Sequence, residues 1–308
     1  MELLRVGTQI DFISRMKPAA VLSIILIIIS AGSVIYHGGL NMGVEFEGGT
    51  EVHIKFAQAI KSDEIRSIMN STAAPVESVQ QLGLPQDNEF LLRFSQDSQE
   101  PSDFTEMSFQ KELEGLIKSN PKFKGALLQD IVRIGPNVTK ELIRKAVISI
   151  LLGWFVIMFY LMLRFEFGFG LGAVIAIIHD VIITVGALSV VDKEFTLTIV
   201  AALLTVIGYS VNDTIVIFDR IRENLRLKKN MGFRELVNNS VNQTLSRTIL
   251  TVFTALLVLM SLFFFGGSVI HDFAYTLIVG ITVGTYSSIF IASAFILVWR
   301  ERKEPAAG

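Results

Sequence analysis

The 308 residues are 51% hydrophobic and have a mean hydropathy of +0.54, above the values usual for a soluble domain of this length. The formal net charge of −2 excludes the strongly basic character typical of nucleic-acid-binding proteins. The chain has no cysteine, which excludes disulfides, thiolate metal sites and a cysteine nucleophile. The composition therefore predicts a membrane-embedded chain that is held together by packing and has no nucleic-acid partner.

Six apolar stretches are long enough to cross a hydrocarbon core of about 30 Å as helices. They are residues 19–36, 143–163, 167–190, 195–218, 249–265 and 273–299. The first follows Arg15 and Lys17, as the apolar region of a signal peptide would, but it is longer and lacks a clear cleavage site. We therefore interpret it as a retained membrane anchor.

Basic residues near the ends of the spans are unevenly distributed, and such residues stay on the cytoplasmic side. The two terminal segments and the short segments after spans two and four hold 14 Lys and Arg, whereas the alternate short loops hold only Lys193. We therefore expect both termini to be cytoplasmic, together with a loop at 219–248 and a tail at 300–308. The long segment 37–142 then lies on the far side of the membrane.

Within the segment 37–142, strand-like and helix-like patterns alternate. Strands are predicted at 51–57, 78–82, 90–95 and 130–134, and helices at 62–71 and 102–119. This β-α-β-β-α-β order predicts an α+β ferredoxin-like domain inserted into an all-α bundle of six transmembrane helices. Gly48 and Gly49 precede the first strand and predict a structural turn. No phosphate-binding loop of the GxxxxGK[ST] type occurs, so ATP hydrolysis is not expected.

Two acidic residues lie inside predicted spans, where a charge costs about 2.5–3.5 kcal/mol and therefore marks a candidate functional site. Asp213 lies in span four beside Asn212, and Asp180 lies in span three beside His179. We interpret Asp213 as a proton site, with a hydrogen bond to a neighbouring helix as the alternative. Arg247, near the start of span five, is either its counter-charge or an anchor at the membrane surface. For His179 and Asp180 the pattern favours packing over proton transfer.

Small and polar residues form stripes along three spans, at spacings that place each stripe on one helix face. The stripes are Ala173, Ala176, Asp180, Thr184 and Ala187 in span three, Ala201, Thr205, Gly208 and Asn212 in span four, and Gly280, Gly284, Ser288 and Ala292 in span six. We expect all three faces to pack against other helices.

The runs Val206–Asn224 and Ser240–Thr248 resemble the SecD/SecF family of protein translocase subunits, within the resistance-nodulation-division superfamily. Supporting runs are Ile178-His-Asp-Val181, Gly135-Pro-Asn-Val138 and the Gly48-Gly49 pair. The chain departs from the family pattern at Glu45, where Asp is usual, and at Thr139, where Gly is frequent. Both departures concern details of turns.

The resemblance implies a half-transporter of the inner membrane, with residues 37–142 periplasmic. It would pair with SecD, associate with the SecYEG channel and accessory membrane subunits, and use the proton-motive force to help move unfolded polypeptides outward. Asp213 and Arg247 match the family's proton pathway. The resemblance implies protons as the coupling ion, no other cofactor and no metal, and no catalytic residue or enzyme activity is expected.

Two alternatives remain open at this point. One is half of a proton-driven exporter of small molecules or lipids, which would need a larger external domain with an apolar pocket. The other is an architectural subunit that steadies a channel without conducting protons, for which loss of the Asp213 charge would leave secretion intact.

Overall fold

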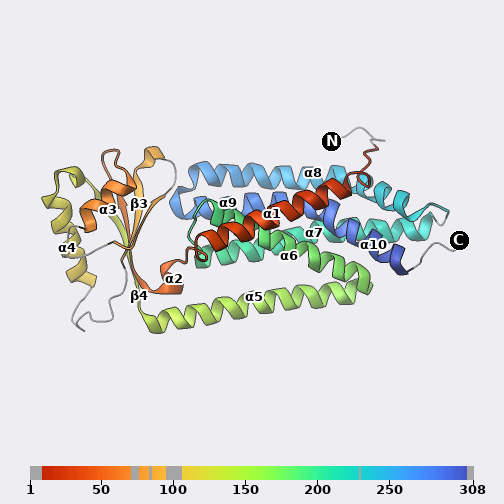
Figure 1. The fold of residues 1–308 in the computed structure, drawn as a ribbon, viewed down its shortest axis with the longest axis horizontal. Helices are drawn as coiled ribbons and strands as arrows, with labels where there is room; N and C mark the ends of the chain where they lie inside the picture. The colour runs from red at the N-terminus through yellow and green to blue at the C-terminus, as the bar shows by residue number, and fades with distance from the viewer. Residues whose placement is uncertain (1–8, 71–75, 83–84, 95–105, 229, 304–308) are drawn as a thin grey trace. The chain divides into compact units, whose positions relative to one another are not determined.

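The computed structural model describes residues 9–70, 76–82, 85–94, 106–228 and 230–303. Its fold divides into two compact units. The larger unit comprises Met1–Asn41, Ile148–Phe265 and Asp272–Gly308, and the smaller comprises Met42–Val147 and Gly266–His271. The larger unit is a helix bundle and the smaller contains a sheet (Figure 1).

The smaller unit is built on a four-stranded antiparallel sheet in the order β2-β3-β1-β4. Its elements are, in chain order, α2 (Val44–Glu47), β1 (Gly49–Lys55), α3 (Ser62–Asn70), β2 (Ser78–Leu82), the 3-10 turn η1 (Pro85–Asp87), β3 (Glu89–Phe94), α4 (Glu106–Ser119), the 3-10 turn η2 (Pro121–Phe123) and β4 (Leu127–Ile134). The predicted ferredoxin-like order is therefore confirmed. The predicted helix 102–119 is described only from Glu106 onward, because its first four residues lie outside the described residues.

Alternation along the two central strands creates the core of this unit. Val52 and Ile54 of β1 and Phe90 and Leu92 of β3 are all at most 2% exposed, because successive strand residues point to opposite faces. Apolar residues of α3 and α4 belong to the same buried cluster, so both helices cover that one face. The cluster comprises Val52, Ile54, Phe56, Ile65, Met69, Val76, Phe90, Leu92, Phe94, Leu113 and Phe123.

Within the described residues, six helical segments are long and apolar enough to cross a membrane, which confirms the predicted number of spans. The helices are α1 (Met16–Tyr36), α5 (Pro136–Arg164), α6 (Phe167–Val190), α7 (Leu197–Leu227), α8 (Phe233–Phe265), α9 (Gly267–Ser287) and α10 (Ser293–Lys303). A π-helical turn, η3 (Ser288–Ala292), joins α9 to α10 within the sixth span.

The segment expected to be a loop, 219–248, is helical except near its middle. Helix α7 continues to Leu227, and α8 already begins at Phe233. The end of an apolar run therefore does not mark the end of the helix. Beyond that point, Ile221 of α7 and Val237 of α8 are fully buried and keep both helices packed.

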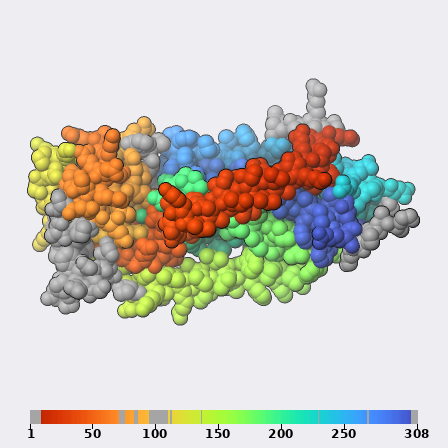
Figure 2. All heavy atoms as spheres, viewed as in Figure 1, coloured from red at the N-terminus to blue at the C-terminus, as the bar shows by residue number. Residues whose placement is uncertain are grey.

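The spans differ in how much of their surface this chain covers. In α6 and α7, more than half of the apolar stretch that could cross a membrane is buried within this chain. In α1, α5 and α8 the buried share of that stretch is 17%, 11% and 11%. Figure 2 shows α1 lying on the surface of the bundle. Exposed apolar side chains such as Ile24 and Ile28 lie on this helix, and they are the type of surface that lipid or another membrane chain covers.

Close helix contacts follow two of the three predicted stripes. In span six, a Cβ added to Gly280 would lie 2.3 Å from Val206 Cγ2, and one added to Gly284 would lie 2.9 Å from Ser210 Cβ, so these glycines bring α9 against α7. The span-three stripe is also largely buried. The span-four prediction is wrong within this chain: Ala201, Thr205, Gly208 and Asn212 are exposed. Helix α7 instead presents Val206 and Ser210, which lie on a neighbouring face, to α9.

Candidate functional site

Asp213 lies on the buried face of α7, within the helix bundle. Its residue is 4% exposed, and its Oδ2 atom has no hydrogen-bond partner among the residues that the structure describes. A carboxylate without partners costs much more to bury than a hydrogen-bonded one. This oxygen is therefore free to take a proton or to face a group from another chain.

Arg247 lies on α8, with its side chain exposed, and exerts a coulombic attraction on Asp213. The two residues form no ion pair of 4.0 Å or less in the described part of the chain, so the attraction acts across a gap. The hydroxyl of Tyr209, one turn before Asp213, donates to the Thr251 carbonyl at 3.0 Å and ties α7 to α8. Asp213 and Arg247 thus lie on adjacent helices, as the sequence analysis expected of a charge pair, but they form no direct ion pair.

Asp180, on α6, has a contrasting environment because both of its carboxylate oxygens are hydrogen-bonded. The hydroxyls of Ser210 on α7 and Ser287 on α9 donate to Oδ2 at 2.6 and 2.8 Å. His179 Nδ1 lies 2.9 Å from Oδ1. Asp180 is 1% exposed and His179 is 5% exposed, so one carboxylate joins three helices in the interior of the bundle.

The network continues from His179 to the first span. His179 Nε2 lies 3.0 Å from Ser23 Oγ, which lies 3.0 Å from the Tyr286 hydroxyl. Tyr286 in turn donates to the Ala19 carbonyl at 2.5 Å. An unbroken chain of polar contacts therefore runs from α1 through α6 to α7 and α9. We call it the Asp180 network.

A π-helical turn lies beside this network. Thr214 Oγ1 lies 2.7 Å from Ser288 Oγ, and Ser288 also reaches the Ser210 carbonyl at 3.4 Å. The Ser293 hydroxyl donates to the Ser288 carbonyl at 3.0 Å, five residues back. Single π turns inside α-helices occur frequently at functional sites. Here the turn brings the Ser288 hydroxyl to α7, one residue beyond Asp213.

The sequence analysis singled out Asp213, Arg247, His179 and Asp180 but not the residues that form hydrogen bonds around them. Serine and threonine in a helix often bond to their own preceding turn, as Thr184 does to the Asp180 carbonyl, so their presence alone predicts no network. The partners that the sequence missed are Ser23, Ser210, Thr214, Tyr286 and Ser287. Asn212, beside Asp213, is exposed and lies outside the network.

In the smaller unit, the predicted glycine turn has the backbone that glycine permits. Gly48 has φ 79° and ψ 173°, and Gly49 has φ 119°. Arg93 of β3, which the sequence analysis did not single out, is 3% exposed and donates to Glu47 Oε2 at 2.9 Å and to the Met42 carbonyl. A buried guanidinium therefore fixes the segment just before the turn.

Comparison with known proteins gives consistent matches over most of the chain. The family profile described as "Protein export membrane protein SecD/SecF, C-terminal" matches residues 117–302, and the "SecD/SecF GG Motif" matches residues 34–60. "Protein translocase subunit SecF" of Calditerrivibrio nitroreducens is 40% identical over 96% of each chain. The subunit of the same name from Desulfurispirillum indicum is 42% identical over 95% of this chain and 92% of its own.

A solved structure has the same fold. The crystal structure of SecDF from Thermus thermophilus, titled a translocon-associated membrane protein, matches with a TM-score of 0.87 and 35% identity. The match covers 97% of this chain and 40% of that chain. A second crystal structure, of SecDF in a super-membrane-facing form, matches with a TM-score of 0.69 at the same identity. The larger protein thus contains one region equivalent to this chain.

Proposed function

The chain belongs to the SecD/SecF family of protein-export membrane proteins, and on that premise we propose that it uses the proton-motive force to help move polypeptides across the inner membrane. It is a multi-pass membrane protein and a subunit of the protein translocase. The proposal adds the energy source, the coupling residues and the partners.

The observation that carries the proposal is the buried Asp213 carboxylate with an unpartnered oxygen. An ionisable residue inside a span is costly, so its retention in the bundle favours a function in moving charge. Protons are suited to this role because they can remove the charge of the carboxylate during each cycle. A proton that crosses a potential of 100 mV releases about 2.3 kcal/mol, and several protons together supply enough free energy for a domain motion.

Coupling would proceed through the attraction between Asp213 and Arg247. When Asp213 is ionised, Arg247 draws α8 toward α7, and protonation removes this attraction. We propose that α7 then shifts against its neighbours and moves the external domain, which grips the emerging polypeptide. The gap between the two side chains supports this cycle, because a loose pair reorganises at lower cost than a buried salt bridge.

The Asp180 network has a different role in this proposal. Its carboxylate is saturated by hydrogen bonds, so it is suited to holding α6, α7 and α9 together while Asp213 titrates. His179 extends this support to α1 through Ser23. We propose that His179 and Asp180 serve packing and that Asp213 serves proton transfer.

SecD is the proposed partner in the membrane. The Thermus SecDF chain matches this one over only 40% of its length, so the remainder of that protein supplies a second part. The exposed stripe of Ala201, Thr205, Gly208 and Asn212 on α7 supports a helix partner, because small residues let helix backbones approach closely. A partner on this stripe would also cover the helix face next to Asp213.

The remaining assignments follow from family membership and from charge. We propose contacts with the SecYEG channel, with accessory membrane subunits and with the unfolded polypeptide. The distribution of basic residues supports cytoplasmic termini and a periplasmic domain at 37–142. We propose no hydrolytic site and no cofactor other than the coupling proton.

The test is the export rate of a secreted precursor into inverted membrane vesicles that contain this chain, SecD and SecYEG. Asp213→Asn keeps the shape of the side chain and loses its titratable charge. We expect it to lower the export rate and to abolish the effect of a protonophore. The matched control is Asp192→Asn, which makes the same change outside the spans at a residue with φ 51°, where Asn is tolerated. Unchanged export by Asp213→Asn, with the protonophore effect intact, would instead support an architectural subunit.

A further inference from the structure

A cationic cavity lies at the end of the helix bundle where α6 begins and α10 ends. Its volume is about 510 Å³, within the range of about 300–1,000 Å³ that small-molecule sites occupy. Its lining includes three arginines, Arg222, Arg226 and Arg300, and four aromatic residues, among them Phe167, Phe233 and Trp299. We call it the arginine cavity. None of these residues belongs to the Asp213 pair or to the Asp180 network.

The charge of the cavity is strongly positive. Glu166 is the one acidic residue in its lining, against three arginines. Arg222 is partly neutralised by Asp219, whose Oδ1 lies 3.5 Å from its Nη1. Arg226 is exposed and forms no hydrogen bond or ion pair with any residue that the structure describes. Its guanidinium is therefore available to an external anion.

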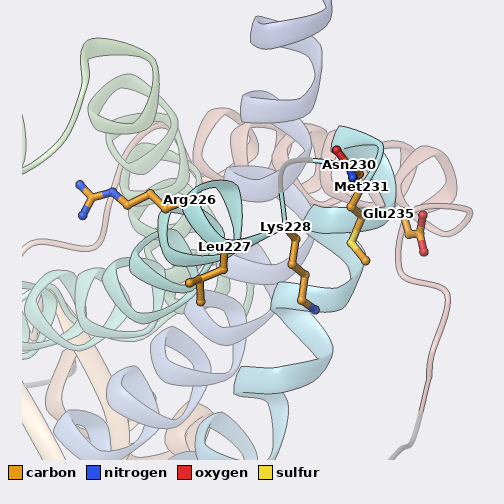
Figure 3. A pocket seen from close by; sticks show the side chains of 6 residues that line it. All are labelled: Arg226, Leu227, Lys228, Asn230, Met231 and Glu235. Atoms are coloured by element: carbon orange, nitrogen blue, oxygen red, sulfur yellow. The ribbon is translucent and has the colours of Figure 1, made fainter.

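Arg226 also borders a second cavity, whose acidic lining residue, Glu235, does not neutralise it. In Figure 3, Arg226 extends away from Lys228 and from Glu235, which points to the other side of the α7–α8 connection. Arg226 lines this adjoining cavity, of about 690 Å³, and a third one of about 310 Å³. It therefore stands where three hollows of the surface meet.

Two of the aromatic residues of the lining, Phe167 and Trp299, lie at the ends of spans three and six, and Phe233 lies at the start of α8. The Arg300 guanidinium stacks over the Phe233 ring, with Cζ 4.7 Å from its centroid. The rings of Phe167 and Trp299 have centroids 5.9 Å apart. A Cβ at Gly168 would lie 2.5 Å from Trp299 Nε1, so the indole packs directly on the backbone of α6. Aromatic residues with cations at the end of a span are typical of the membrane interface.

We propose that the arginine cavity binds the phosphate-bearing headgroup of an anionic phospholipid. Guanidinium groups bind phosphate oxygens in bidentate geometry, and basic pockets between membrane helices bind lipid headgroups. The aromatic wall accommodates the apolar part of the lipid next to the headgroup, which a free phosphate ion would leave uncovered. The site requires only that this end of the bundle meets a membrane surface, so it does not depend on proton coupling.

Native mass spectrometry of the purified full-length chain tests the proposal. The protein is titrated with a phosphatidylglycerol and, separately, with a phosphatidylcholine of the same acyl chains. We expect tighter binding of phosphatidylglycerol. Each arginine contributes about fivefold to affinity, from about 1 kcal/mol per basic residue near an anionic lipid surface. Arg226→Gln should therefore weaken phosphatidylglycerol binding about fivefold, and Arg226→Gln with Arg300→Gln about 25-fold.

The matched control is Arg220→Gln. It makes the same charge change on the same helix, at a residue that pairs with Glu223 and does not line the cavity. It should bind phosphatidylglycerol as the parent does, and phosphatidylcholine binding should be the same in every variant. Since Arg226 is exposed and forms no hydrogen bond or ion pair in the described part of the chain, its variant keeps the test informative even where Arg300→Gln perturbs folding.

Three results would overturn the proposal. Equal binding of the two lipids by the parent would show that no headgroup is selected. An equal loss in Arg220→Gln and Arg226→Gln would show a general charge effect. Displacement of phosphatidylglycerol by inorganic phosphate at similar concentration would identify a free anion as the ligand instead of a lipid.

Discussion

Substitution of Gly280 by alanine adds one methyl group where α9 packs on α7. The new Cβ would lie 2.3 and 2.7 Å from the two Cγ atoms of Val206, whose residue is fully buried. Ordinary carbon contacts are about 3.5–4.0 Å, so the atoms must separate by more than about 1 Å. Valine in a helix has one strongly preferred rotamer and cannot turn aside. The helices themselves must move apart.

The magnitude follows from two opposing terms. Overpacking of this kind costs about 1–3 kcal/mol. Replacing glycine by alanine inside a helix raises the free energy of unfolding by about 0.5–1 kcal/mol. Gly208, on the exposed face of α7, has no atom within 4 Å of its added Cβ and isolates the second term. We therefore expect Gly280→Ala to be less stable than Gly208→Ala by about 1–3 kcal/mol.

The assay is the free energy of unfolding of the full-length chain in bicelles, measured by steric trapping for both variants and the parent. Val206→Ala removes the two clashing methyl groups and leaves Cβ at 3.0 Å. We expect it to rescue Gly280→Ala, with a coupling free energy of about 1–2 kcal/mol in a double-mutant cycle. Equal stability of the two glycine variants, or strictly additive effects with Val206→Ala, would refute the close approach of α7 and α9.

Three further outcomes are expected. Asp180→Ala should lower the free energy of unfolding by about 2 kcal/mol, from three hydrogen bonds of about 0.6 kcal/mol each in a membrane protein, whereas Asp213→Asn should lower it little, as steric trapping will show. Gly48→Ala should cost about 1–3 kcal/mol because φ 79° with ψ 173° strains a side chain, which thermal unfolding followed by circular dichroism detects. Burial acts to raise the pKa of Glu89, but the hydrogen bond and charge of Lys55 outweigh it and hold this pKa below its usual value. The pair's stabilisation is then present above the unfolded pKa of about 4.3 and lost as pH falls through the lower folded pKa. The protection factors of the β3 amides, which compare the observed exchange rate with the intrinsic rate at the same pH, should therefore fall in acid, and should fall less in Glu89→Gln.

Each of these expectations has a contradicting result. An Asp213→Asn variant as unstable as Asp180→Ala would assign both carboxylates to packing. A Gly48→Ala chain that unfolds at the parental temperature would mean that the turn relaxes without strain. Amide exchange in β3 with the same acid dependence in parent and Glu89→Gln would show that the Lys55 pair is not the origin of the pH effect.

Secondary structure and the number of spans were predictable because each depends on local pattern. The span 167–190 and the strand 78–82 have the predicted boundaries, since apolar runs and strand alternation are interrupted there by turns. The extent of α7 and α8 was not predictable from hydropathy, because their polar ends are helical through packing on each other and, for α8, through bonds to the segment around Ile10. Asn238 and Asn242, for example, both bond to the backbone of Ile10.

The direction in which a face points was harder to predict than its existence. Gly280 and Gly208 belong to similar stripes, yet one is buried against Val206 and the other is exposed. Only the tertiary arrangement, including chains outside this one, decides which stripe is covered. The Asp180 network was missed for the same reason, since Ser210 and Ser287 are unremarkable until α7 and α9 are brought together.

The π turn at Ser288–Ala292 means that the sixth span has two angular phases. One additional residue per turn rotates everything that follows by roughly 100° relative to an uninterrupted α-helix. The first phase directs Gly280 and Gly284 toward α7, and the second directs Trp299 and Arg300 into the arginine cavity. A one-residue deletion within η3 would leave length and hydropathy almost unchanged, yet it would turn the end of the span away from the cavity. In this helix a single backbone insertion therefore allows one segment to serve two surfaces.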